Sequence, residues 1–231
     1  MGVFGGSFNP IHFGHLLVAD EIAELLALDR VLFVPAASPP HKPAAELAPP
    51  AHRFEMTKRA VGEHPKFEVS DVELKRSGPS YTVDTLEALR ERGDLHLLIG
   101  SETFLDLLSW REPRRVAALA RLIVVPRSGN GFDPEGPLAQ KVLKELGLGH
   151  FDSPSAEAQT SYPLASPPAA ARQTPPLSPG PRTPILAPVA SLPISGSDLR
   201  KRAREGRSLV YRMPLAVVAY IREHGLYRDP A

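Results

Sequence analysis

Short apolar runs alternate with longer amphipathic segments through most of the chain. Residues 31–33, 95–99 and 122–125 are continuous apolar runs, which are typical of strands buried on both faces of a parallel sheet. Segments with helical periodicity separate them, most clearly residues 14–28, where apolar residues recur every three or four positions. Parallel strands need such crossover segments. The alternation therefore predicts an α/β fold with a Rossmann-like parallel sheet flanked by helices.

The same patterns predict the remaining elements. Further strands are expected at residues 3–4, 67–74 and 183–189, and further helices at residues 53–62, 80–92, 102–108, 116–120, 197–205 and 214–224. Ser80 is expected to cap its helix, and the prolines within 183–189 suit only an edge strand. The last two helices form a small C-terminal helical region.

Proline separates one stretch from the rest of the chain. Of 26 prolines, eleven lie between Asp152 and Pro193, among many Ser and Ala and almost no large apolar residues. Such a segment cannot bury enough surface to offset its ordering entropy, so we expect residues 152–182 to be a disordered or extended insertion. Residues 1–151 then form the Rossmann-like core, and residues 183–231 complete the same domain.

Charge and residue usage exclude several classes of protein. The formal net charge is only +1, so no basic field indicates a nucleic-acid partner. The lack of Cys excludes a disulfide framework, a thiol nucleophile and cysteine-ligated metal. No apolar run reaches the roughly 18–20 residues that span a bilayer, and no signal peptide opens the chain. We therefore expect a cytoplasmic protein that does not act on membranes.

The strongest functional signal is the string GGSFNPIHFGH at residues 5–15. It joins the first strand to the first helix, at the carboxyl end of the sheet, where ligands bind in parallel α/β folds. Its two adjacent glycines let a ligand approach the backbone, and the helix N-terminus attracts anions. His12 and His15 share a helix face that Gly14 keeps open, so both can donate to phosphate oxygens. The alternative, a tight turn with two surface histidines, is disfavoured by the length of the string.

A second signal, ISGSDLR, lies near the other end of the chain at residues 194–200. Small hydroxylated residues just before a helix satisfy its free amide groups and form a second anion site. Arg200, one turn into that helix, can bind a phosphate through two N–H groups. The alternative is a plain helix cap before a solvated basic helix. The presence of the first motif in the same chain disfavours it.

Together the two motifs resemble the nucleotidylyltransferase superfamily, with its His-x-Gly-His and C-terminal Ile-Ser-Ser-Thr-like signatures. Within it, the chain is similar to the bacterial nicotinate mononucleotide adenylyltransferases of NAD biosynthesis. The Pro-Pro-His-Lys loop at residues 39–42, residues 78–86, Trp110, residues 122–127 and the terminal residues 220–227 support that family. The resemblance implies an enzyme that transfers AMP from ATP to nicotinate mononucleotide, giving deamido-NAD and pyrophosphate, with Mg²⁺ carried on ATP.

The resemblance also assigns roles to residues. The catalytic residues would be His15, His12 and Lys42. The ATP-binding residues would be Gly6, Ser7, Phe8, His12, His15, Gly100, Glu102, Ile194, Ser195, Ser197 and Arg200. The acceptor-binding residues would be Ser7, Lys42, Thr82 and Trp110. Without the resemblance, Trp110 is better interpreted as an anchor of the core.

The chain departs from the family pattern at two site positions. Gly196 replaces the usual Ser, and Glu102 stands where an Asp usually grips the ribose hydroxyls. Other functions stay open at this point: an adenylyl- or cytidylyltransferase that uses nicotinamide mononucleotide or phosphopantetheine, a non-catalytic nucleotide sensor, and an interaction protein with a proline-rich segment. The sequence also leaves open the preference for an acid or amide acceptor and the oligomeric state, with a homodimer as one option.

Overall fold

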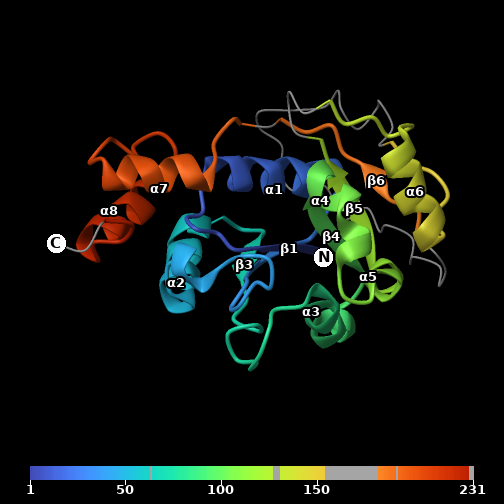
Figure 1. Cartoon of the computed structure of the whole chain (residues 1–231), viewed down its shortest axis with the longest axis horizontal. Coiled ribbons are helices and arrows are strands. Elements are labelled where there is room, and N and C mark those ends of the chain that lie inside the picture. The colour runs from blue at the N-terminus through green and yellow to red at the C-terminus, as the bar shows by residue number, and fades with distance from the viewer. Residues whose placement is uncertain (63, 127–130, 154–181, 191, 229–231) are drawn as a thin grey trace.

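The computed structural model describes residues 1–62, 64–126, 131–153, 182–190 and 192–228. At its centre is a parallel sheet with the strand order β3-β2-β1-β4-β5-β6 (Figure 1). The strands are β1 (Gly2–Gly6), β2 (Val31–Pro35), β3 (Phe67–Val69), β4 (Leu95–Gly100), β5 (Ala120–Val125) and β6 (Ile185–Leu186). The strand order reverses between β1 and β4, and ligands bind outside the carboxyl ends of the strands at such a reversal.

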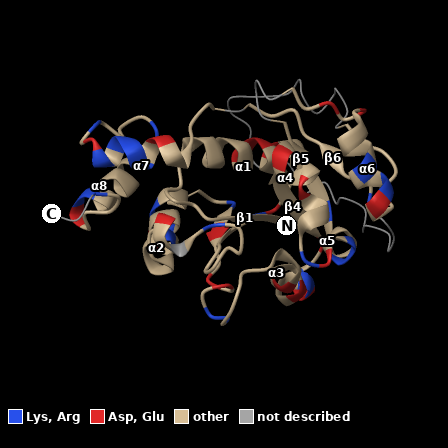
Figure 2. Ribbon diagram, in the orientation of Figure 1, with Lys and Arg blue, Asp and Glu red and all other residues tan. Residues whose placement is uncertain are grey.

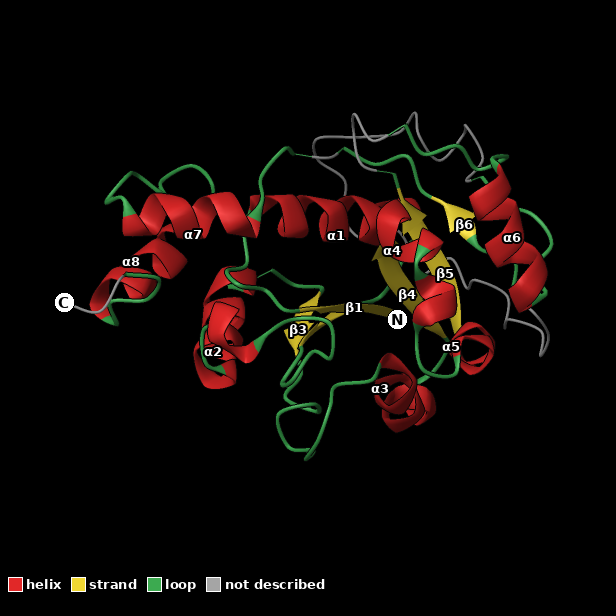
Figure 3. Cartoon of the chain, in the orientation of Figure 1, coloured by secondary structure: helices red, strands yellow, loops and turns green. Residues whose placement is uncertain are grey.

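Each face of the sheet has its own hydrophobic core, because successive residues of a strand point to opposite sides. In β2, Val31 and Phe33 join one core, whereas Leu32 and Val34 join the other. Helices cover both faces (Figure 3). The first core contains residues of α1 (Phe13–Leu25), α2 (Pro50–Val61), α7 (Gly196–Arg204) and α8 (Leu215–Glu223). The second contains residues of α3 (Thr82–Leu89), α4 (Ser101–Leu105), α5 (Pro113–Leu119) and α6 (Pro137–Leu146).

This arrangement confirms the α/β fold expected from the alternating pattern. Burial on both faces is the reason why β2 and the runs at residues 97–99 and 122–125 are continuously apolar. The short strand expected among the prolines is also present: β6 pairs with β5 as the last strand of the sheet, and an isolated bridge joins its other side to Asp152. The two C-terminal helices are α7 and α8, each within two residues of its expected ends.

Three expectations were wrong in detail. Strand β3 ends at Val69 rather than at residue 74, because the chain then folds into a turn in which the Lys75 amide donates to the Asp71 carbonyl at 3.0 Å. Tyr81, not Ser80, is the N-cap of α3. The expected helix at residues 102–108 is divided into α4 and a 3-10 turn, η3 (Leu107–Ser109).

Helix α6 has no counterpart among the elements expected from sequence. Its signals are nevertheless present: Pro137 occupies the first turn, and Gly147 ends the helix in the left-handed conformation with φ of 69°. Two further 3-10 turns, η1 (Ala44–Glu46) and η2 (Arg90–Arg92), complete the elements of the described residues.

The expected proline-rich insertion, residues 152–182, falls almost wholly outside the described residues, so the proposed division of the chain stays a prediction. Across the part of the chain that the structure describes, no helix is long and apolar enough to cross a bilayer.

Candidate active site

The chain leaves β1 through a buried turn. Phe8 is 2% exposed, adopts a positive φ of 42°, and packs edge-on against Phe4 with 5.7 Å between ring centres. A β-carbon at Gly6 would lie 3.2 Å from the Phe8 ring, so a side chain there would displace that ring. The turn is therefore fixed by packing at the carboxyl end of β1, beside β4.

His12 and His15 lie against each other at the start of α1. His12 is the N-cap and is buried, and the two rings stack with their centres 3.7 Å apart. The His12 amide donates to Nδ1 of His15 at 3.3 Å. Because Nδ1 of His15 accepts a hydrogen bond, its proton in the neutral ring is on Nε2, which makes Nε2 a donor. A β-carbon at Gly14 would lie 3.1 Å from Nδ1 of His12, so a side chain there would press on the His12 ring.

Asn9 joins this turn to the C-terminal region. Its backbone carbonyl accepts a hydrogen bond from Nη1 of Arg200 at 2.9 Å, across 191 positions of sequence. Its side-chain oxygen accepts from the Tyr227 hydroxyl at 2.9 Å and from the Ala48 amide at 3.0 Å, and its side-chain amide donates to the Glu46 carbonyl at 2.9 Å. Burial raises the pKa of Tyr227, which keeps its hydroxyl protonated and able to donate. One buried residue thus holds four segments together.

The start of α7 presents the hydroxyl groups of the second motif. Ser195 is the N-cap, and its hydroxyl accepts from the Asp198 amide at 3.2 Å and lies 3.2 Å from the hydroxyl of Ser197. A β-carbon at Gly196 would lie 3.1 Å from the Asn9 carbonyl oxygen, the atom that binds Arg200. The glycine at this position therefore allows α7 to approach the first motif closely.

Lys42 brings a third segment to the same place. Its ammonium group donates to the hydroxyl of Ser7 at 2.9 Å. The pKa of Lys42 is lowered, first by burial and then by the positive charges of Arg200 and Arg53. The positive charges of Lys42, Arg53 and Arg200 therefore repel one another. Such a cluster of positive charges is suited to binding a polyanion.

Arg53 is a functional residue that sequence reasoning missed. It is fully buried on α2 and donates to three backbone carbonyls: Ala48 at 2.8 Å, Ser7 at 2.8 Å and Ala37 at 3.1 Å. The planar guanidinium group suits this task because its donors diverge in one plane. It fixes the first motif relative to the loop that carries Lys42. Nothing in its sequence context separates it from the solvated arginines of other helices.

Beside this cluster is a pocket of about 220 Å³. Its lining residues are Pro40, His41, Ser80, Tyr81, Thr82, Ser109, Trp110 and Arg111. Thr82 and Trp110, the expected acceptor residues, are thus brought together. Trp110 is half-buried, packs on the second core and lines the pocket, and its role in binding the acceptor stays a prediction.

The loop at residues 38–42 connects the pocket to the cationic cluster. Ser80 holds this loop, because its hydroxyl accepts from the Ser38 amide at 3.0 Å and its amide donates to the Ser38 carbonyl at 2.9 Å. This is the role that Ser80 takes in place of the expected helix cap. Pro40 and His41 line the pocket, while the next residue, Lys42, contacts Ser7. The same short loop therefore lines the pocket and contacts the first motif.

The comparison with known proteins agrees with this geometry. The cytidylyltransferase-like family matches residues 3–202. A probable nicotinate-nucleotide adenylyltransferase from Roseiflexus sp. (strain RS-1) is 40% identical over 230 residues, covering 99% of this chain and 98% of the relative. One from Thermus thermophilus is 40% identical over 231 residues, covering 99% of each. The chain belongs to the nicotinate-nucleotide adenylyltransferase family.

Solved structures support the family fold. The nicotinic acid mononucleotide adenylyltransferase of Plasmodium falciparum, complexed with NaAD, superposes with a TM-score of 0.68 at 19% identity, covering 98% of this chain and 96% of that one. A putative nicotinate-nucleotide adenylyltransferase from Vibrio parahaemolyticus superposes with a TM-score of 0.55 at 16% identity, covering 99% and 95%. At these identities the likeness concerns the fold alone.

The remaining predicted residues lie at the same edge of the sheet. Gly100 ends β4, which runs parallel to β1, and serves as the N-cap of α4; Glu102 follows in the first turn of that helix and is exposed. Ile194 packs against the first core just before Ser195. Whether Glu102 takes the role of the Asp usual in the family stays a prediction.

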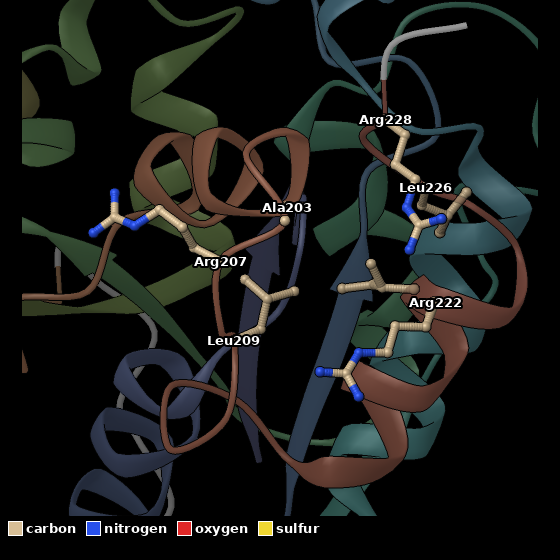
Figure 4. Close-up of a pocket in the computed structure, with 8 residues that line it drawn as sticks. Ala203, Arg207, Leu209, Arg222, Leu226 and Arg228 are labelled. Carbon is tan, nitrogen blue, oxygen red and sulfur yellow. The ribbon is translucent and has the colours of Figure 1, made fainter. Parts of the chain in front are cut away.

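A second, smaller pocket lies between α7 and α8 and has a volume of about 60 Å³ (Figure 4). Its lining residues are Ala203, Gly206, Arg207, Leu209, Ile221, Arg222, Leu226 and Arg228. Basic residues continue along α7 beyond Arg200 (Figure 2). None of the residues assigned to the site lines this pocket.

We predict that Arg53→Lys destabilises the protein. A lysine cannot reach three carbonyls with a planar set of donors, and each buried carbonyl left without a donor costs about 1–3 kcal/mol. The free energy of unfolding in urea should fall by about 2–3 kcal/mol. The matched control is Arg59→Lys on the same helix, where the side chain is 40% exposed and pairs with Glu55. Its effect should stay under about 1 kcal/mol, and equal losses in the two variants would contradict the role of Arg53.

Proposed function

We propose that this protein transfers the adenylyl group of ATP to nicotinate mononucleotide, forming deamido-NAD and releasing pyrophosphate. The observation that carries the proposal is the hydrogen bond between Arg200 and the Asn9 carbonyl. It joins the two anion-binding motifs at the carboxyl end of the sheet, so that one triphosphate can contact both. The family relatives named for this reaction cover the whole length of the chain.

The proposed reaction is an in-line displacement at the α-phosphorus of ATP. A phosphate oxygen of the mononucleotide forms the new P–O bond, and the bond from the α-phosphorus to the bridging oxygen breaks, so that pyrophosphate leaves with its electron pair. The attacking phosphate is already anionic near pH 7, so the protein needs no strong base. Its task is to bring two polyanions together and to stabilise the charge that develops.

In this proposal each group of the site has a defined task. The Nε2–H of His15 donates to the phosphate that undergoes substitution, and His12, whose ring stacks on that of His15, binds the ATP phosphates beside it. The hydroxyls of Ser195 and Ser197, with Arg200, hold the departing phosphates. Lys42 and Ser7 lie between the phosphates of the two substrates. Thr82 and Trp110 hold the pyridine ring, for which an indole is a suitable stacking partner.

We include Mg²⁺ bound to ATP in the proposal. The donors that converge at the site are imidazole, hydroxyl, ammonium and guanidinium groups, which bind phosphate oxygens rather than a hard cation. Among the described residues there is no cluster of three or more His, Asp or Glu side chains that could hold a metal. The site thus fits a cation held by the phosphates, where it would neutralise part of their charge.

The direct test is pyrophosphate release by the purified protein with ATP, Mg²⁺ and a panel of acceptors: nicotinate mononucleotide, nicotinamide mononucleotide and phosphopantetheine. We expect turnover with nicotinate mononucleotide. His15→Ala should lower kcat by about 10²–10³-fold, the typical effect of removing one donor to a transition state. The KM for ATP should change by less than about 3-fold, because the lost interaction strengthens only in the transition state.

The matched control is His64→Ala, a histidine outside the site whose ring bonds to Asp20 at 3.0 Å. It should leave kcat unchanged. Turnover only with phosphopantetheine would contradict the proposed acceptor. An unchanged kcat in His15→Ala would remove His15 from the reaction.

The lowered pKa of Lys42 predicts an alkaline limit to ATP binding. Lys42 attracts phosphate only while protonated, and its pKa lies below the ordinary 10.5 because of burial and two neighbouring cations. Its charge is lost as the pH rises through that lowered value. The KM for ATP should therefore increase on the alkaline side, and Lys42→Arg should move the increase to higher pH. The control is Lys58→Arg, which changes an exposed lysine and should leave the pH dependence unaltered. If the KM for ATP rises at the same pH in the unmodified protein and in Lys42→Arg, this assignment is contradicted.

A further inference from the structure

One side chain with a fixed positive charge, that of Arg111, lines the pocket that contains Thr82 and Trp110. Of the described residues that line it, Arg111 is the only Lys, Arg, Asp or Glu. Its guanidinium group supplies a positive charge and several N–H donors in one plane. The other lining groups are an indole, a phenol, hydroxyls, a proline ring and an imidazole, and none of these carries a fixed charge that would separate a carboxylate from a carboxamide on the ring.

Arg111 is held at the pocket by an aromatic contact. Its guanidinium carbon lies over the ring of Tyr81, 4.8 Å from the ring centre. Tyr81 is itself a lining residue and the N-cap of α3, so its position is fixed by the helix. A cation–π contact of this kind orients the guanidinium while leaving its N–H groups available to a ligand.

The ion pair of Arg111 is too weak to occupy those N–H groups. Its Nε lies 3.7 Å from Oε1 of Glu112, beyond hydrogen-bond distance, and both side chains are about half exposed. Glu112 is also shared with Arg115, whose Nη1 is 3.4 Å from its other oxygen. The described residues accept no hydrogen bond from the Arg111 side chain.

We propose that Arg111 binds the carboxylate of a pyridine-carboxylate mononucleotide and thereby selects the acid over the corresponding amide. This inference rests on the proposed function. The two mononucleotides differ only in the substituent on the pyridine ring. A carboxylate offers two acceptors to the guanidinium fork, whereas a carboxamide offers one acceptor and places an NH₂ donor against the N–H groups. Thr82, with one hydroxyl that both donates and accepts, cannot make this distinction.

Arg111→Gln tests the inference, because glutamine keeps a polar side chain but removes the charge and the fork. The value of kcat/KM for the acid mononucleotide should fall about 10- to 100-fold, as expected for losing hydrogen bonds to a charged group. The value of kcat/KM for the amide mononucleotide should stay within about 3-fold of that of the unmodified protein. Arg111→Lys keeps the charge without the fork and should retain part of the preference. The matched control, Arg114→Gln, changes a 77% exposed arginine of α5 that pairs with Glu145 and does not line the pocket.

The chain also offers a readout that does not depend on turnover. Trp110 is its only tryptophan and lines the pocket, so quenching of its fluorescence reports binding of each mononucleotide without ATP. The Kd of the acid form should rise in Arg111→Gln by the same factor as its kcat/KM falls, while the Kd of the amide form should not change. The melting temperature of each variant shows that it is folded.

Two results would overturn the inference. If the ratio of kcat/KM for the acid to kcat/KM for the amide is unchanged in Arg111→Gln, groups other than Arg111 distinguish the two substituents. If kcat/KM falls equally for both mononucleotides, Arg111 supports the pocket through its contact with Tyr81 and does not contact the substituent. Failure of the proposed function is distinct from both, because the unmodified protein itself would then not turn over nicotinate mononucleotide.

Discussion

The hydrogen bond from Arg200 to the Asn9 carbonyl is the contact on which the site depends. It ties the turn after β1 to the start of α7, and the side chain of Asn9 adds Tyr227 and the loop at residues 46–48 to the same point. Because Asn9 is buried, losing one of these partners would leave one of its polar groups without a hydrogen bond. The two motifs are therefore held in one geometry before any substrate arrives, which lowers the entropic cost of binding.

Side chains of like charge also repel one another at this contact between the two motifs. Lys42, Arg53 and Arg200 lie close enough that the two arginines help to depress the pKa of Lys42. The fold maintains this by giving each arginine backbone carbonyls to bind and Lys42 the hydroxyl of Ser7. A bound triphosphate would relieve the repulsion. The site is thus more favourable with its polyanion than without it, which is expected where binding energy is used to position two negatively charged substrates.

The sequence predicted the sheet, the flanking helices other than α6, and both motifs because these features are local: apolar runs, helical periodicity and short contiguous strings. It did not predict the contacts that join distant segments. Arg53 looks like any helical arginine until its three carbonyl partners are known. The reason for Gly196 is equally hidden, since it lies in the distance to Asn9. Ser80 was given a local role as a helix cap, whereas its partner, Ser38, is 42 residues away.

The most direct test of the central claim is a crystal structure with nicotinate mononucleotide and an ATP analogue whose α,β-bridge is a methylene group. The account predicts that the triphosphate contacts both motifs at once, with the α-phosphate nearest His15, the departing phosphates at Ser195 and Ser197, and the pyridine ring in the pocket of Trp110. An analogue bound to only one motif, or seated in the small pocket between α7 and α8, would contradict the account.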